Sequence, residues 1–182
     1  LLTLGWKRGM WLIILFFAAL LTAFALEHYE ARIDQHVWLV MFIPLVISAG
    51  GNSGGQSSTL IISSMARGEI QLTDWVKVIR REIAMGLMLG SLLGLLGWVA
   101  GLFLAPQPIY AAIIPITIIC VVICGTLSGS LLPLFFRRLG LDPALMSNPF
   151  VAGIVDILGI IIYMSVAGIF YSLYPMGEAV TG

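Results

Sequence analysis

Residues 149–175 read PFVAGIVDILGIIIYMSVAGIFYSLYP, an apolar run whose one charged side chain is Asp156. The run exceeds the roughly 20 apolar residues that a membrane-spanning helix needs. An ionised carboxyl group at the centre of such a helix costs about 2.5–3.5 kcal/mol on insertion scales. No Lys or Arg lies inside any apolar run of the chain, so a salt bridge within the membrane does not easily explain the acid. Because ionisable side chains inside a membrane mark functional sites, Asp156 is the first candidate residue.

The composition places the whole chain in a membrane. Of its 182 residues, 60% are hydrophobic and 10% are charged, whereas a soluble domain carries about 25% charged residues. We therefore predict an all-α integral membrane protein that forms a single transmembrane domain over residues 1–182. The formal net charge is zero, so nucleic acid is not an expected partner. Cys120 and Cys124 lie in an apolar run without His, Asp or Glu nearby, and we interpret them as core residues rather than metal ligands.

Five apolar runs are long enough to cross a lipid bilayer. They cover approximately residues 10–26, 37–65, 83–104, 109–136 and 149–174. Of the nine Lys and Arg residues, all but Arg32 fall on one side of the membrane in this arrangement. Since basic residues accumulate on the cytoplasmic side, we expect a cytoplasmic N-terminus and an external C-terminus. The expected location is the plasma (inner) membrane of a cell, with the chain crossing it several times.

A polar stretch interrupts the second run. Residues 48–59 read SAGGNSGGQSST, and lipid cannot satisfy the hydrogen-bonding groups of such a stretch. One interpretation is close helix packing through small residues four positions apart. The other is the lining of a pore or cavity, which accounts better for two amide side chains on one helical face. The candidate pore-lining residues are Gly50, Gly51, Asn52, Gly54, Gly55 and Gln56. Pro44 and the glycines also favour a broken or kinked helix here.

Two catalytic interpretations of these residues are disfavoured by the sequence. Residues 51–54, GNSG, fit the GxSG pattern of intramembrane serine proteases, whose serine needs a histidine at membrane depth as general base. The only histidines, His28 and His36, lie in or beside the first external loop. An aspartyl intramembrane protease needs two acids on facing helices, and only Asp156 is available. We therefore predict that the chain is not an enzyme.

Two segments, taken together and in order, resemble the MgtE family of magnesium channels. The first is Pro44-Leu45-Val46 followed by GGNSGGQ at residues 50–56, and the second is LDPA at residues 141–144 followed by Asn148-Pro149 and Asp156. The resemblance extends over essentially the whole chain. It implies a homodimer whose ion path runs near the two-fold axis, lined by the second and fifth runs. It also implies that Asp156 binds magnesium, with Asn148 and Ala152 along the same path.

Members of this family commonly carry an N-terminal helical domain and a pair of CBS domains before the membrane part. No such cytosolic regulatory domain is expected within residues 1–182. The resemblance leaves open a regulatory domain upstream of residue 1.

The spacing of Asn148, Ala152 and Asp156 is a separate observation, because side chains four residues apart share one face of a helix. Mg²⁺ prefers oxygen ligands and gives up its waters reluctantly. One Asp per chain does not neutralise a divalent ion, whereas a two-fold axis would bring two Asp156 carboxylates together.

Three functional hypotheses follow from these residues. The first is a magnesium-selective channel that carries hydrated Mg²⁺, with Mg²⁺ as the transported and pore-bound ion and no organic cofactor. The alternative is a sodium- or proton-coupled carrier of divalent cations. The third is a membrane scaffold whose polar stretch only drives dimerisation.

Several polar residues also have a purely structural interpretation. Asn148-Pro149 suits the N-cap and first turn of a helix, and Asp142-Pro143 suits a cap or a turn. Asp74 is expected to cap the amphipathic stretch TDWVKVIRREI. Glu82 lies beside Arg80 and Arg81 and is expected to form a local ion pair or an interfacial anchor rather than an ion site.

Overall fold

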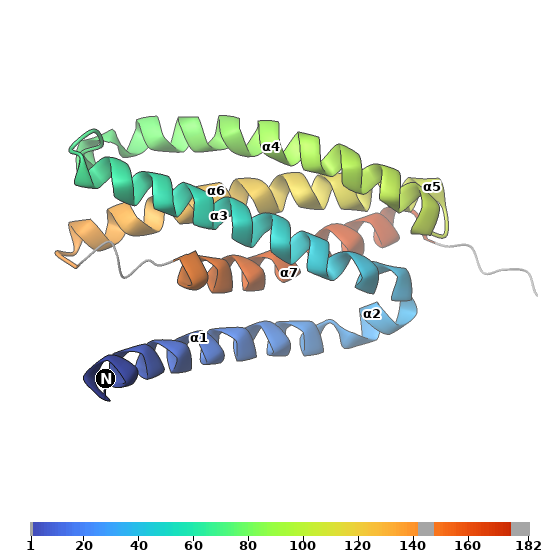
Figure 1. The fold of residues 1–182 in the computed structure, drawn as a ribbon. Helices are drawn as coiled ribbons and strands as arrows, with labels where there is room; N and C mark the ends of the chain where they lie inside the picture. Colours follow the sequence, from blue (N-terminus) through green and yellow to red (C-terminus); the bar gives the residue numbers. More distant parts are fainter. Residues whose placement is uncertain (1, 142–147, 176–182) are drawn as a thin grey trace, which may run out of the picture.

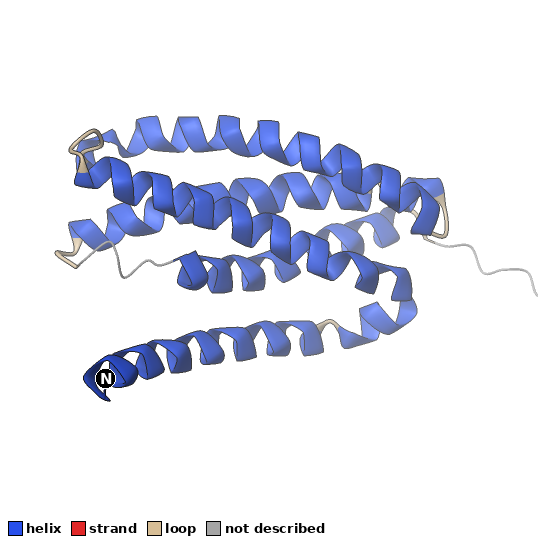
Figure 2. Ribbon diagram, in the orientation of Figure 1, coloured by secondary structure: helices blue, strands red, loops and turns tan. Residues whose placement is uncertain are grey.

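Helices account for most of the computed structural model, which describes residues 2–141 and 148–175 (Figure 2). A backbone inside a membrane must satisfy its own hydrogen bonds, and an α-helix does so within one segment. The elements are α1 (Leu2–His28), α2 (Glu30–Gln35), the 3₁₀ helix η1 (Val37–Phe42), α3 (Ile43–Ala66), the 3₁₀ helix η2 (Leu72–Asp74), α4 (Trp75–Leu104), α5 (Pro108–Ala111), α6 (Ile113–Arg138) and α7 (Asn148–Leu173).

Within the described residues, five helical segments are long and apolar enough to cross a membrane, as predicted. They are Gly9–His28, Val37–Ala66, Leu72–Leu104, Pro108–Arg138 and Asn148–Leu173. The chain is a multi-pass membrane protein. The third segment begins before the predicted residue 83, because the amphipathic stretch is already part of α4. Asp74 directly precedes α4, but its Oδ2 accepts a hydrogen bond from the backbone N–H of Gln71 (2.9 Å) and does not cap α4.

The second spanning segment differs from the prediction in one respect. α3 is an unbroken α-helix from Ile43 to Ala66, so the predicted break at the glycines does not occur. The change in helix type lies before the polar stretch, where η1 gives way to α3 at Ile43. Pro44 falls in the first turn of α3, where a proline costs no intrahelical hydrogen bond.

α6 lies inside the bundle and packs against α3, α4 and α7 (Figure 1). Glycines on α4 allow its close approach to α6. A Cβ added at Gly90 would lie 2.9 Å from the Ile119 Cα, and one added at Gly94 would lie 3.2 Å from the Pro115 Cα. α1 instead packs on α7 at the edge of the bundle and leaves many apolar side chains exposed.

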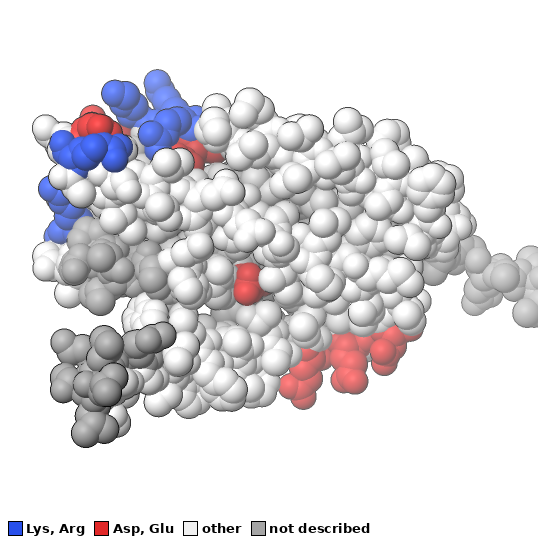
Figure 3. Space-filling view, viewed as in Figure 1, with Lys and Arg blue, Asp and Glu red and all other residues white. Residues whose placement is uncertain are grey.

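The charged side chains gather at the ends of the bundle (Figure 3). The turn between α3 and α4 lies at the same end as the last residues of α6 (Figure 1). We call it the basic end, and it carries Arg67, Lys77, Arg80, Arg81, Arg137 and Arg138. The junction of α1 and α2 lies at the opposite end, which we call the acidic end, and it carries Glu27, Glu30 and Asp34. The orientation of the two ends relative to the cytoplasm remains a prediction.

Aromatic side chains at the acidic end join η1 to α7. The Tyr163 hydroxyl donates a hydrogen bond to the Leu39 carbonyl oxygen (2.9 Å), and the Trp38 Nε1–H donates one to the Tyr171 hydroxyl (2.8 Å). The His36 ring stacks on Tyr171 with ring centroids 3.5 Å apart. These contacts hold the segment that leads into α3 beside α7.

Candidate metal site between α3 and α7

One face of α7 lies against α3. It carries Asn148, Ala152 and Asp156, the three residues that their spacing of four places on one face of a helix. A Cβ added at Gly51 would lie 3.4 Å from the Ala152 Cβ and 3.3 Å from the Asp156 Oδ1. One helical turn closer to the basic end, a Cβ added at Gly55 would overlap the Asn148 side chain. Asn148, Ala152 and Asp156 therefore follow one another along the contact with α3. The glycines allow this contact, because a side chain at position 55 would overlap Asn148 and one at position 51 would press against Asp156 and Ala152.

The Asp156 side chain is half-buried. Within the residues that the structure describes, its carboxylate has no hydrogen-bond or ion-pair partner. At 1.5 Å per residue, Asp156 lies about 12 Å along α7 from Asn148, the first residue of the helix. The carboxylate is thus well inside the 26-residue spanning helix. Figure 3 shows an acidic side chain standing alone in the middle of an uncharged surface.

A single chain supplies only part of a metal site. The described ranges 2–141 and 148–175 contain no group of three or more His, Cys, Asp or Glu side chains that could hold a metal ion. The contact of α3 and α7 offers one carboxylate, from Asp156, and one amide, from Asn148. A divalent cation there would keep a net positive charge unless a second carboxylate came from another chain.

Gly50 and Gly54 face both α6 and α7. A Cβ added at Gly50 would lie 2.5 Å from the Val121 Cγ1, and one added at Gly54 would lie 3.0 Å from the Gly125 carbonyl oxygen. Both glycines are buried. In this chain they allow the backbones of α3 and α6 to approach, as the packing interpretation predicts.

Asn52 and Gln56 lie on a third side of α3. Both side chains are exposed and line a cavity of about 490 Å³ between α3 and α4. The Asn52 Nδ2 donates a hydrogen bond to the Ser48 Oγ (3.0 Å). Across the cavity, α4 contributes Leu89, Leu92, Leu93 and Leu96. The six candidate pore-lining residues thus face three directions: α7, α6 and the cavity.

Glu82 forms the local ion pair that the sequence predicts, since the Arg81 Nη2 lies 2.8 Å from its Oε1. The sequence did not reveal how deeply Glu82 is buried: its relative exposure is 4%. The Ser57 hydroxyl of α3 donates a hydrogen bond to its Oε2 (2.8 Å), so the carboxylate joins α4 to α3. The helical spacing of the glycines could have indicated this burial. Glu82 lies four residues before Gly86 and therefore on the face of α4 that carries the glycines.

Asn148 and Pro149 are the first two residues of α7, so both lie in its first turn, one position further into the helix than the predicted N-cap and N1. The contact of the Asn148 side chain with Gly55 shows that the start of the helix and the candidate site share this residue. Asp142, Pro143 and Ala144, which carry part of the family resemblance, lie outside the described residues.

Comparison with known proteins bears directly on this region. Residues 43–166 match the model of the MgtE family, described as divalent cation transporters. The magnesium transporter MgtE of Thermus thermophilus is 37% identical over 160 residues, which cover 88% of this chain and 35% of that protein. The magnesium transporters MgtE of Enterococcus faecalis and Bacillus subtilis are 31% and 28% identical and cover 90% and 91% of this chain.

The chain spans 35–37% of the length of these relatives. The matched residues contain the whole of α3, α4 and α6 and the part of α7 that carries Asp156. The match therefore includes both helices that form the candidate metal site. This chain belongs to the MgtE family of divalent cation transporters, a family of membrane transport proteins rather than enzymes.

Proposed function

We propose that two copies of this chain form a path for Mg²⁺ across the membrane, with the ion held between their Asp156 carboxylates. The observation that carries the proposal is the Asp156 side chain itself: it lies deep in a spanning helix, half-buried, with no partner among the described residues. An ionised carboxylate in that position is stable only if a cation or water reaches it. The names of the relatives support magnesium as the cation.

The need for a second copy follows from charge. One Asp156 carboxylate leaves a divalent ion with an unbalanced positive charge in a poorly polar environment. A two-fold axis close to Asp156 would provide two carboxylates, two Asn148 amides and a symmetric path. The exposed amides of Asn52 and Gln56, on another side of α3, also need a partner that lipid does not offer, which a second chain or water would provide.

The chemistry of the site suits an ion that keeps its water shell. Mg²⁺ demands nearly octahedral oxygen coordination and usually retains several waters. The Asp156 carboxylate and the Asn148 amide can accept or donate hydrogen bonds to such waters. The positive partial charge at the start of α7 opposes a cation near Asn148, which makes the carboxylates necessary for occupancy.

We propose that transport is passive, as in a channel. Ionic currents through the purified protein in a planar bilayer, under a magnesium gradient without sodium or proton gradients, measure this directly. Currents under these conditions are the expected result. A strict requirement for a sodium or proton gradient would replace the channel by the coupled carrier and would leave the Asp156 site in place.

The role of Asp156 is tested by magnesium uptake into vesicles that contain the full chain. Asp156→Asn keeps the shape of the side chain and removes its charge, and Asp34→Asn makes the same change at an exposed acid of the acidic end. We expect uptake to fall at least about tenfold for Asp156→Asn, since even the loss of an outer-shell partner weakens metal sites by about 10–100-fold. Uptake should change little for Asp34→Asn. Equal uptake by both variants with the dimer retained would favour the scaffold hypothesis.

A further inference from the structure

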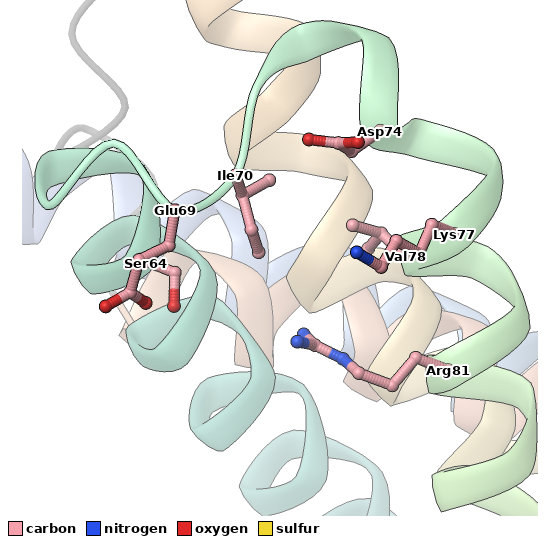
Figure 4. Close-up of a pocket in the computed structure, with 7 residues that line it drawn as sticks. All are labelled: Ser64, Glu69, Ile70, Asp74, Lys77, Val78 and Arg81. Atoms are coloured by element: carbon pink, nitrogen blue, oxygen red, sulfur yellow. The ribbon is translucent and has the colours of Figure 1, made fainter.

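The turn between α3 and α4 encloses a pocket of about 210 Å³ at the basic end of the bundle (Figure 4). Ser64 lies at the end of α3, Glu69 lies in the turn, and Asp74 directly precedes α4. Lys77 and Arg81 lie four residues apart on α4 and therefore share a face. The pocket is at the level where a spanning helix meets the lipid headgroups, because α4 becomes apolar immediately after Glu82.

The walls of this pocket carry opposite charges. Figure 4 shows Lys77 and Arg81 extending from α4 toward the α3 side of the pocket, with the carboxylates of Glu69 and Asp74 around the same space. A free anion would meet two carboxylates here, and a free cation would meet an ammonium and a guanidinium group. The pocket therefore suits a small ligand that carries both signs of charge.

Some of these charged groups retain free hydrogen-bonding capacity. Within the described part of the chain, Lys77 has no hydrogen bond or ion pair. Arg81 uses its Nε and Nη2 on Glu82, which leaves its Nη1 available, and its side chain is 48% exposed. Asp74 uses its Oδ2 on the backbone N–H of Gln71 and keeps its Oδ1. Glu69 is paired with Arg67, and this hydrogen bond lowers the pKa of Glu69.

We propose that this pocket binds the phosphoethanolamine headgroup of a membrane phospholipid. Lys77 and the free Nη1 of Arg81 donate hydrogen bonds to the phosphate oxygens, and the primary ammonium group donates to the free Oδ1 of Asp74. Both charges of the headgroup are then compensated at the membrane surface. The site is separate from the path at Asp156, so its occupancy can be measured whether or not the protein conducts ions.

The surface below the pocket provides a place for the acyl chain. A second cavity of about 240 Å³ shares Arg81 with the headgroup pocket and continues between α3 and α4. Its apolar lining includes Leu60, Met85 and Leu89, of which Leu60 is 64% exposed. A lipid whose phosphate lies at Arg81 can begin its chain over Leu60, which lies one helical turn closer to the basic end than the Gln56 amide that also lines this cavity.

The test is native mass spectrometry of the full chain after reconstitution in vesicles and extraction in mild detergent. The vesicles contain phosphatidylethanolamine, phosphatidylcholine and phosphatidylglycerol in equal amounts. The choline headgroup has no N–H donor for the acidic wall, and the glycerol headgroup has no cation. We expect phosphatidylethanolamine to be retained about fivefold better than either, the effect of one favourable charged contact at a membrane surface.

Matched variants separate this pocket from general surface charge. Lys77→Gln should lower the retention of phosphatidylethanolamine about fivefold, whereas Arg80→Gln, on the same helix but outside the pocket, should not. Asp74→Asn should lower the retention of phosphatidylethanolamine and leave that of phosphatidylglycerol unchanged. Equal retention of the three lipids, or equal effects of Lys77→Gln and Arg80→Gln, would overturn the proposal.

Discussion

At the scale of single residues, Gly51 and Gly55 determine how closely the acid-bearing face of α7 approaches α3. Gly51 leaves room for the Asp156 carboxylate. The Asn148 side chain occupies the space that a side chain at position 55 would need. A glycine inside an exposed helix costs roughly 0.5–1 kcal/mol relative to alanine. Close packing of α3 on α7 offsets that cost, because a larger side chain at either position would push the two helices apart.

Gly55→Ala should destabilise the protein, because the added methyl group overlaps the Asn148 side chain. We expect a loss of about 1–3 kcal/mol, typical of overpacking. Gly9→Ala is the matched control, since a Cβ added at Gly9 meets nothing within 4 Å. Thermal unfolding in detergent should show a lower midpoint for Gly55→Ala and an unchanged or higher midpoint for Gly9→Ala. Similar midpoints for the two variants would contradict the close contact.

His36 should make the stability of the acidic end depend on pH. Burial lowers the pKa of His36, and the positive charge of Arg32 lowers it further. The unfolded chain therefore binds the proton first as the pH falls, so stability is lost below the ordinary value of about 6.5 and is unaffected above it. Melting midpoints measured between pH 8 and pH 5 should show this loss.

The two histidines provide the comparison for this pH effect. His36→Gln should reduce the loss of stability below about pH 6.5, because the titrating ring stacked on Tyr171 is gone. His28→Gln changes an exposed residue and should give the same dependence of the melting midpoint on pH as the unaltered chain. A profile that is identical for His36→Gln and the unaltered chain would contradict the assignment.

The sequence predicts the residues of the candidate site better than their contacts. The shared face of Asn148, Ala152 and Asp156 follows from a spacing of four and the regular geometry of a helix. The direction of each glycine of α3 does not follow, because it depends on which neighbouring helix packs on which side. Gly50 and Gly54 face both α6 and α7 while Gly51 and Gly55 face α7 alone, and no local pattern distinguishes the two pairs.

At the scale of helices, Glu82 links α4 to α3 through Ser57 and is held by Arg81. Glu82→Ala would leave the buried Ser57 hydroxyl without its partner, at a cost of about 1–3 kcal/mol. Glu69→Ala also removes one acid from an arginine pair, but that pair is 56% and 54% exposed, so solvent screens it and it contributes little to stability. The thermal midpoint should therefore fall clearly for Glu82→Ala and little for Glu69→Ala. The reverse order would contradict the role of Glu82 as a buried link.

The polar stretch of α3 was predicted to break the helix, but α3 is continuous. Glycine destabilises a helix that stands alone in water, and a run of glycines favours a break on that basis. In α3 the glycines lie where α6 and α7 approach the backbone, so packing compensates for the weak local preference. The actual irregularity, the 3₁₀ helix η1, lies in an apolar stretch that has no glycine or proline to indicate it.

At the scale of the whole molecule, the separation of charge into a basic and an acidic end predicts the orientation in the membrane. The basic end should face the cytoplasm. Cysteines introduced at Arg138 and at Glu30, each in a chain whose Cys120 and Cys124 are replaced by alanine, lie at opposite ends of the bundle and test this in intact cells. A membrane-impermeant maleimide should label Glu30→Cys from outside and should label Arg138→Cys only after the membrane is opened. Labelling of Arg138→Cys from outside would reverse the orientation.

The number of spans was readable from the sequence because each apolar run is long enough to be recognised alone. The arrangement of the spans was not readable, because apolar side chains satisfy lipid and protein neighbours almost equally well. The central position of α6 and the peripheral position of α1 became clear only from the packed structure. In the proposed site this chain contributes one of two carboxylates, so the geometry of that site depends on how two copies meet.

The most direct measurement is anomalous diffraction from crystals of the protein soaked with Mn²⁺, a divalent ion with oxygen ligands that replaces Mg²⁺. A site shared by two chains predicts one anomalous peak on a two-fold axis, between the Asp156 carboxylates of the two copies. Asp156 side chains that point into lipid, away from any two-fold axis and without a metal peak, would contradict it.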